Sequence, residues 1–351
     1  MKRILAICLV LTMFFLTGCD LMFDNEQLYV APYHGIQQQA TNKIVHVETY
    51  AQMREALIAE MKTGSDHLLV SVSSFQTATA DYYVETAIAY ILDNTPIGAY
   101  AVNNISYEIG TNQGETVIAF QIDYFRGKGE IMQIKQAVDM SDAWSYITTA
   151  LSECEPSVVF RVEEYTQTDI LQLVANYCKE NPHIVMERPE VRFSVYPDNG
   201  KERIVEVLFT YQTNREDLRK MKKQVETVFT SAELYVQQTA QRETYAQLYA
   251  FLMQRKDYTI GTSITPAYSL LQHGVGDSRS FAEVYSAMCR QAGMPCQVIS
   301  GTKNAEPYFW NVVRYGGKYY HVDLLSCRQQ GKFRMLSDKD MTEYVWDYSA
   351  F

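Results

Sequence analysis

Residues 270–325 read LLQHGVGDSRSFAEVYSAMCRQAGMPCQVISGTKNAEPYFWNVVRYGGKYYHVDLL, and this stretch decides the fold of the C-terminal part of the chain. A glycine turn, Gly274–Asp277, leads into a helical run that begins at Ser278, and Gly293-Met294-Pro295 is typical of a helix end. An apolar run then closes on Gly301. Two strand-like runs follow, at 309–313 and 319–323, on either side of a glycine pair. The stretch therefore predicts one helix followed by strands.

The order of these landmarks resembles the transglutaminase-like family, a branch of the papain-like thiol enzymes. In that family a helix opens with Cys-x-Asp/Gly-Tyr/Phe-Ala and ends in Gly-Ile-Pro, and a strand then runs into a glycine. Strands carrying His-Ala-Trp-Asn and Gly-Lys-Trp-Tyr-x-Val-Asp follow. The counterparts in this chain are Ser278-Arg279-Ser280-Phe281-Ala282, Gly293-Met294-Pro295, Tyr308-Phe309-Trp310-Asn311 and Gly317-Lys318-Tyr319-Tyr320-His321-Val322-Asp323. The resemblance implies a papain-like α+β domain over about the last third of the chain.

The family's catalytic residues are replaced at two of three positions. Ser278 stands where the nucleophilic Cys belongs, Tyr308 stands where the His belongs, and Asp323 alone matches. A serine hydroxyl needs an adjacent base to attack, and a phenol that titrates near 10 is a poor proton acceptor at neutral pH. Ser278, or Asp277 before it, is also a good N-cap for the helix. The resemblance therefore implies a pseudoenzyme whose cleft, lined by Trp310 and Asn311, binds a peptide, glycan or protein partner.

Two histidines are candidate replacement bases. His321 lies two residues before Asp323, so on a strand both side chains point to one face. His273 lies five residues before Ser278 and could fold back over it. An active serine-dependent acyl hydrolase or amidase is thus the first alternative, although a lone His more often lies on the surface. A structural envelope spacer is the second alternative.

The first eighteen residues have the pattern of a signal peptide. Lys2-Arg3 precede the apolar run Ile4–Leu16, which is too short for a permanent membrane span. The ending Leu16-Thr17-Gly18-Cys19 resembles a bacterial lipobox, which implies cleavage before Cys19 and lipidation of its sulfur. Residues 19–45 then read as a tether. We expect a lipid-anchored protein on the extracytoplasmic face of the cell membrane.

Between the tether and the C-terminal domain, two segments have the pattern of one unit used twice. Each segment runs helix, strand, helix, proline, strand, strand, with landmarks such as Pro96 and Pro182 at corresponding places. The predicted fold class is α+β, with modules at 46–139 and 140–230 followed by a transglutaminase-like domain at 231–351. Residues from Glu216 to about Gln254 are expected to be helical with few breakers and to carry the chain into the last domain.

Composition excludes several classes of function. The formal net charge is −10, or −12 once Lys2 and Arg3 are cleaved off with the signal, and no basic cluster is present, so nucleic acid is not an expected partner. No cysteine has zinc-site spacing with a histidine, and no metal or cofactor is expected. Five cysteines remain in the predicted mature domains, an odd number that leaves one disulfide open: Cys154, Cys178, Cys289, Cys296 and Cys327.

Overall fold

The computed structural model describes residues 44–72, 77–112, 114–236 and 240–347. The expected signal peptide, Cys19 and nearly all of the tether lie outside the described residues. Residues 44–351 form one compact unit. In the part of the chain that the structure describes, no helix combines the length and the apolar character that a membrane span requires.

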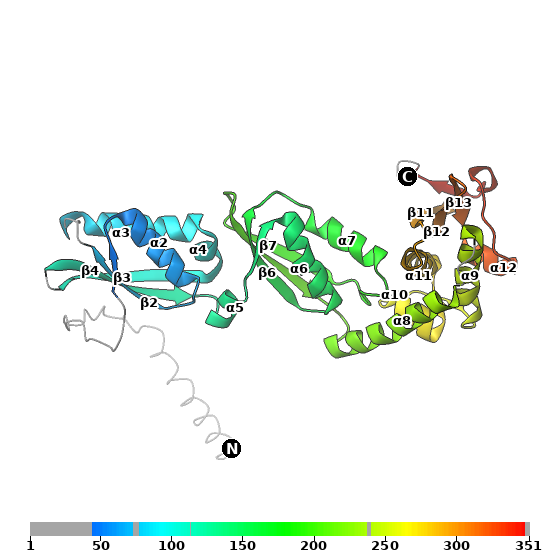
Figure 1. The fold of residues 1–351 in the computed structure, drawn as a ribbon, viewed down its shortest axis with the longest axis horizontal. Helices are drawn as coiled ribbons and strands as arrows, with labels where there is room; N and C mark the ends of the chain where they lie inside the picture. Colours follow the sequence, from blue (N-terminus) through cyan, green and yellow to red (C-terminus); the bar gives the residue numbers. More distant parts are fainter. Residues whose placement is uncertain (1–43, 73–76, 113, 237–239, 348–351) are drawn as a thin grey trace, which may run out of the picture. The chain divides into compact units, whose positions relative to one another are not determined.

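The described chain contains helices and strands in alternation (Figure 1). The helices are α2 (Tyr50–Met61), α3 (Thr77–Asn94), α4 (Pro96–Ala101), α5 (Lys128–Met132), α6 (Met140–Ser152), α7 (Ile170–Glu180), α8 (Arg215–Tyr235), α9 (Gln241–Gln254), α10 (Pro266–Tyr268), the π-helix η1 (Ser269–His273), α11 (Ser278–Gln291), α12 (Leu324–Gln329) and the 3-10 helix η2 (Asp338–Asp340). The strands are β1 (Val45–Val47), β2 (His67–Val72), β3 (Val102–Asn112), β4 (Glu115–Tyr124), β5 (Lys135–Asp139), β6 (Ser157–Glu164), β7 (Glu190–Tyr196), β8 (Arg203–Thr210), β9 (Thr259–Ile260), β10 (Val275–Gly276), β11 (Cys296–Lys303), β12 (Glu306–Tyr315), β13 (Lys318–Val322) and β14 (Tyr344–Trp346).

The first sheet has the order β1-β2-β4-β3, and α2, α3 and α4 lie on one side of it in Figure 1. The β1 strand pairs in parallel with β2, with Val45 opposite Val70, so the tether ends one residue earlier than expected. Pro96, a landmark of the repeated pattern, begins α4, because the Thr95 side chain caps this helix and proline suits its first position.

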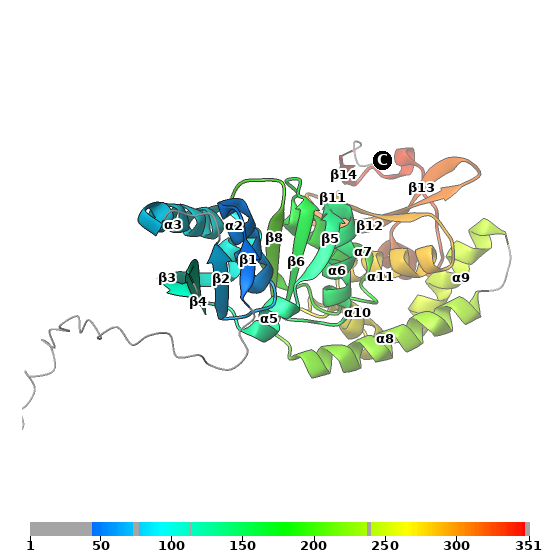
Figure 2. The ribbon, with the colours of Figure 1, turned by 60° about the vertical axis from the view of Figure 1, so that its left-hand side comes forward.

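The second sheet has the equivalent order, β5-β6-β8-β7, again with a parallel first pair. Its α6 helix lies over β5 and β6 (Figure 2), and the buried faces of α6 and α7 share one core with the sheet. The β5 strand precedes the expected boundary at 139/140 yet pairs with β6, so it belongs to the second sheet. That the two segments are tandem copies of one unit stays a prediction.

The residues expected to be helical, from Glu216 to about Gln254, form two helices, α8 and α9. The α8 helix ends at Tyr235 and α9 begins at Gln241, so the run expected to be helical is helical on both sides of an interruption. Both helices bury their apolar faces in the core that also contains α11. The boundary predicted at 230/231 therefore falls inside α8, a continuous helix that packs with the C-terminal core.

The C-terminal sheet, in the order β13-β12-β11-β14, packs against α11. Every residue from Ser280 to Cys289 is buried, so α11 is a core helix without a solvent face. Gly293 ends this helix as predicted. It adopts a φ of +73°, and the Met294 amide donates to the Cys289 carbonyl in a Schellman-type closure. This packing fixes the N-terminus of α11 against the end of β12.

Candidate functional site

Ser278 is the first residue of α11, and Asp277 is its N-cap. The Asp277 carboxylate accepts hydrogen bonds from the Ser280 amide and the Ser280 hydroxyl, both at 2.8 Å. The cap is therefore the residue before Ser278, because only the Asp277 backbone is extended and its side chain can reach back to the first turn. The Ser278 hydroxyl instead accepts a hydrogen bond of 3.3 Å from the Phe309 amide.

Asp323 is held by a closed polar network. It is 2 % exposed, and its side chain caps α12 through the Ser326 amide and hydroxyl. The Tyr308 hydroxyl donates to one carboxylate oxygen at 3.0 Å. The Lys303 ammonium and the Tyr344 hydroxyl donate to the other, at 2.9 and 2.5 Å. The structure thus joins Tyr308 to Asp323, but it places no hydrogen bond from Ser278 to either residue among those described.

The ionisation of this network is set by its contacts. Burial by itself raises the pKa of Asp323, but hydrogen bonds from Ser326, Tyr344 and Lys303 outweigh it and lower the pKa below its ordinary value. Burial and the Asp323 charge both raise the pKa of Tyr308. For Lys303, burial lowers the pKa, while Tyr344 and Asp323 raise it above its usual value. At neutral pH the site therefore holds a carboxylate, an ammonium and neutral phenols.

The imidazole of His321 makes its hydrogen bonds on the Trp310 face of the C-terminal sheet. His321 pairs across the sheet with Val312, so it shares the face of Trp310, while Val313 and Val322 face the core that contains α11. The Trp310 indole donates to His321 Nδ1 at 2.9 Å. That bond leaves Nε2 as the protonated nitrogen, which donates to Asp338 at 3.1 Å. Both ring nitrogens are thus engaged. Asp323 hydrogen-bonds to Tyr308 and Tyr344, which pack on the Trp310 side of the sheet as His321 does, but no hydrogen bond joins His321 to Asp323 among the described residues.

His273 ends η1 and its side chain is exposed. Its imidazole lies edge-on to the Tyr268 ring, with centroids 5.2 Å apart. Neither His273 nor His321, the histidines proposed as replacement bases, is hydrogen-bonded to Ser278 in the described part of the chain.

Trp310 and Asn311 were expected to line a cleft, and both are instead 0 % exposed. The Trp310 ring belongs to a small core with Ile299, Val312 and Met341 on the face away from α11. The Asn311 amide donates to the Ala282 carbonyl of α11 at 2.9 Å. The cleft-lining assignment was wrong because successive residues of β12 are covered on both faces of the sheet, which the sequence pattern alone does not reveal.

The five cysteines are free and buried. Burial raises the pKa of Cys178 and of Cys327 to about 11 each, and it raises the pKa of Cys154 and Cys289 as well. These thiols are therefore protonated at neutral pH and poor nucleophiles. No imidazole hydrogen-bonds to a cysteine in the described part of the chain.

A cavity of about 340 Å³ opens beside the N-terminus of α11. Its walls include Asp277, Arg279 and Ser280 from α11 and Lys179 and Arg188 from the α7–β7 region. Within α11, Arg279 forms an ion pair with Glu283: its guanidinium donates to the buried Glu283 carboxylate at 2.7 Å. Burial raises the pKa of Glu283, against the lowering effect of Arg279.

Lys179 and Arg188 are the cations of this cavity that pair with no carboxylate among the described residues. Lys179 makes a hydrogen bond of 3.4 Å to the Val298 carbonyl, and Arg188 is exposed. The lining also carries the carboxylates of Glu187, Asp277 and Glu283, so the cavity as a whole is balanced in charge. Glu187 and Asp277 accept hydrogen bonds from backbone amides, which leaves Lys179 and Arg188 as the cations that a ligand can pair with, beside a helix N-terminus that also favours negative charge.

Sequence reasoning missed Lys303, Ser326 and Tyr344, the residues that close the network around Asp323. They come from β11, α12 and β14, and no spacing in the sequence connects them. Among the described residues no group of His, Cys, Asp and Glu side chains has the arrangement of a metal site.

A buried helix whose N-terminus abuts an antiparallel sheet, with Tyr308 and Asp323 in contact, is the papain-like arrangement. Residues 229–324 match the family model described as "Transglutaminase-like superfamily", so this part of the chain is a transglutaminase-like domain. Among curated proteins none matches this sequence.

Three solved structures show what the chain is similar to. A crystal structure of a TGase matches at 11 % identity with a TM-score of 0.27, over 60 % of this chain and 65 % of that one. A candidate protease of Parabacteroides distasonis matches at 10 % identity with a TM-score of 0.24, over 73 % and 40 %. A candidate cysteine protease of Cytophaga hutchinsonii matches at 11 % identity with a TM-score of 0.26, over 45 % and 70 %. The chain spans less than two thirds of the length of the first two, and scores this low carry no argument about its chemistry.

Proposed function

We propose that this protein is a lipid-anchored envelope protein whose transglutaminase-like domain is a pseudoenzyme that binds a partner. The observation that carries the proposal is the closed network around Asp323. Its carboxylate is engaged by Lys303, Tyr308, Tyr344 and Ser326, while the only side-chain hydrogen bond of Ser278 among the described residues comes from the Phe309 amide. A nucleophile without a base, and an acid group without a histidine to orient, cannot carry out acyl transfer.

The first test is turnover of amide and ester substrates by wild-type protein and by Ser278→Ala. We expect both to equal the uncatalysed rate, because a serine without its base loses on the order of a million-fold in rate. Ser278→Cys is also expected to stay inactive, since Tyr308 supplies no base to a thiol. Hydrolysis or transamidation by wild-type protein that disappears in Ser278→Ala would instead establish the serine hydrolase alternative.

We place the binding site of the pseudoenzyme in the cavity beside the N-terminus of α11. Lys179 and Arg188 favour an acidic segment of a peptide or protein, or an acidic group on a glycan, because these cations have no carboxylate partner in the described chain. The lipid anchor at Cys19, expected from the sequence, would present this site at the outer surface of the membrane.

The second test is capture from an envelope extract by the full-length chain and by Lys179→Glu/Arg188→Glu. Reversing two charges at the cavity is expected to reduce capture of the partner about a hundredfold, since two hydrogen bonds to charged groups contribute roughly 1.5 kcal/mol each and about 1.4 kcal/mol is a factor of ten. The matched control is Lys223→Glu/Lys332→Glu, which reverses two exposed lysines elsewhere. Equal capture by the cavity variant and the control would remove the cavity as the binding site. A Trp310→Ala variant does not serve as a capture control, because Trp310 is fully buried and its truncation disturbs the packing of the domain.

A further inference from the structure

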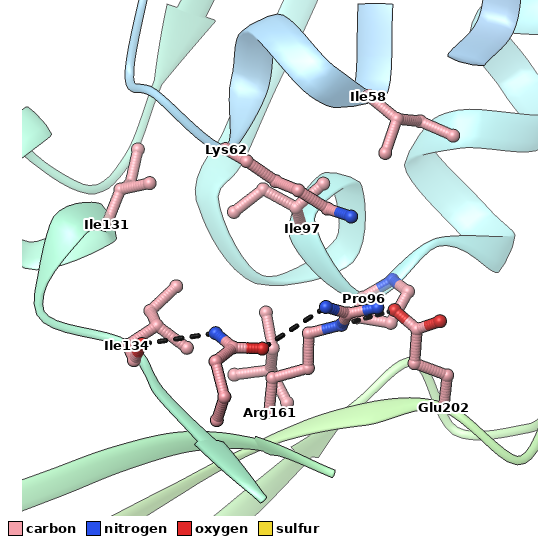
Figure 3. Close-up of a pocket in the computed structure, with 10 residues that line it drawn as sticks. Ile58, Lys62, Pro96, Ile97, Ile131, Ile134, Arg161 and Glu202 are labelled. Atoms are coloured by element: carbon pink, nitrogen blue, oxygen red, sulfur yellow. Dashed lines mark hydrogen bonds and ion pairs between the residues drawn. The ribbon is translucent and has the colours of Figure 1, made fainter. Parts of the chain in front are cut away.

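A second pocket, of about 210 Å³, lies between the first and second sheets and their helices (Figure 3). Its walls are dominated by the isoleucines Ile58, Ile97, Ile131, Ile134 and Ile204. Ile204 comes from β8 of the second sheet, yet it packs in the core of the first sheet. The pocket is therefore part of a packed junction within one compact unit.

Junction contacts outside the pocket support this packing. Arg126 forms an ion pair of 2.8 Å with Glu206, whose side chain is 10 % exposed. The Tyr100 and Tyr196 rings meet edge-on, with centroids 5.5 Å apart. A pocket held between such contacts has walls that are formed before a ligand arrives, which reduces the ordering cost of binding.

The polar side chains of the pocket are two cations, one carboxylate and one amide: Lys62, Arg161, Glu202 and Gln136. Lys62, the C-cap of α2, extends over the pocket, and Arg161 and Glu202 reach it from the opposite wall (Figure 3). Glu202 accepts from Arg161 Nε at 2.5 Å, and Arg161 Nη1 donates to Gln136 at 3.1 Å. In the described chain the Lys62 ammonium has neither a hydrogen bond nor an ion pair. The lining thus carries one positive charge in excess, on a group that is available to a ligand.

We propose that this pocket binds an aliphatic carboxylate of about six to eight carbons, in addition to the partner site beside α11. A cavity of 150 Å³ lined by aliphatic side chains holds benzene, so a volume of about 210 Å³ accommodates roughly eight carbons. The isoleucines enclose the chain, and the carboxylate accepts hydrogen bonds from Lys62 and from the free edge of the Arg161 guanidinium. A ligand seated there touches both sheets' helices and loops and so stabilises the junction.

The test measures binding of sodium octanoate to the full-length chain by calorimetry, at concentrations where octanoate is monomeric. We expect a Kd of about 0.1–1 mM, the range open to a ligand of roughly ten heavy atoms. N-acetyl-leucine distinguishes the two sources of this chemistry: tighter binding of octanoate identifies a free fatty acid, and tighter binding of N-acetyl-leucine identifies a peptide C-terminus. Octanol and octylamine are expected to bind at least tenfold more weakly, because neither places a negative charge beside Lys62.

Substitutions of Lys62 and Ile134 test the two kinds of contact that the pocket offers, charged and apolar. Lys62→Met retains the aliphatic stem and is expected to weaken octanoate binding about tenfold, while Lys223→Met, an exposed lysine of α8, leaves it unchanged. Ile134→Trp, at a half-buried position, is expected to fill the pocket and abolish binding with an unaltered circular dichroism spectrum. Octanol binding as tightly as octanoate, or octanoate binding unaffected by both Lys62→Met and Ile134→Trp, would overturn the proposal.

Discussion

Trp310→Ala is expected to destabilise the transglutaminase-like domain by about 3–5 kcal/mol, the usual range for truncating a buried tryptophan to alanine. Trp310 is 0 % exposed and stacks edge-on against Tyr344 and Trp346, with ring centroids 5.2 and 5.9 Å away. The substitution also removes the indole that donates to His321 Nδ1, leaving a buried acceptor without its donor. Differential scanning calorimetry should therefore show that the Tm of this domain falls by about 10 °C or more.

The tight fit around Trp310 makes relaxation into the cavity unfavourable. Gly301 of β11 lies against this ring, and a Cβ added to Gly301 would come within 2.8 Å of the indole and collide with the Val345 carbonyl. The matched control is Val345→Ala on the neighbouring β14, which is 70 % exposed and is expected to change stability by less than about 0.5 kcal/mol. If both variants melted within 2 °C of wild type, roughly the shift of a surface substitution, the packing role of Trp310 would be refuted.

Lys303→Met is expected to have the second largest effect, a loss of about 3 kcal/mol. The substitution removes the Lys303 ammonium and leaves the Asp323 carboxylate, which is 2 % exposed, without its cation. Removing one partner of a buried ion pair typically destabilises a protein by about 3–5 kcal/mol. The lower end of that range applies because Tyr308, Tyr344 and Ser326 still donate to Asp323. The ammonium also lies 4.9 and 5.0 Å from the centroids of the Tyr308 and Tyr344 rings, a contact that methionine replaces with dispersion alone.

The pH dependence of the same variant follows from the lowered pKa of Asp323. A carboxyl group with a lowered pKa in the folded state adds stability above its unfolded pKa, about 3.9, and this contribution is lost as pH falls through the folded value. Lys303→Met removes one of the lowering contacts, so its acid transition should begin at higher pH than that of wild type. Thermal unfolding between about pH 2 and 7 measures both effects.

Lys332→Met, at an exposed lysine, serves as the control for both measurements. An acid transition that coincides in Lys303→Met, Lys332→Met and wild type would show that Asp323 does not depend on the ammonium. Asp323→Asn completes the comparison, because the stability difference between it and wild type should shrink toward low pH as the wild-type carboxylate gains its proton.

The sequence by itself determined the class of the C-terminal domain, and its landmarks place Ser278 and Tyr308 where the resemblance implies the family's Cys and His. These features are local: Gly293-Met294-Pro295 needs only backbone geometry to end a helix, and Ser278 and Tyr308 are read directly at positions fixed by neighbouring landmarks. The apolar runs likewise located strands such as β12 and β13, since one face of each sheet is buried, but they did not reveal β1, β5, β9, β10 or β14. The end of α8 at Tyr235 and the start of α9 at Gln241 were not predicted, because the apolar periodicity of the flanking residues does not show where a helix ends.

Only the tertiary structure decided what surrounds the family positions. Asp323 meets Lys303, 20 residues away, and Tyr344, 21 residues away, through the pairing of β11 with β12 and β14. Trp310 and Asn311 became core rather than cleft because the sheet is covered on both faces, and His321 turned to Trp310 and Asp338. Side-chain partners distant in the chain depend on strand order and register, and these follow from the packing of whole elements rather than from any local run of residues.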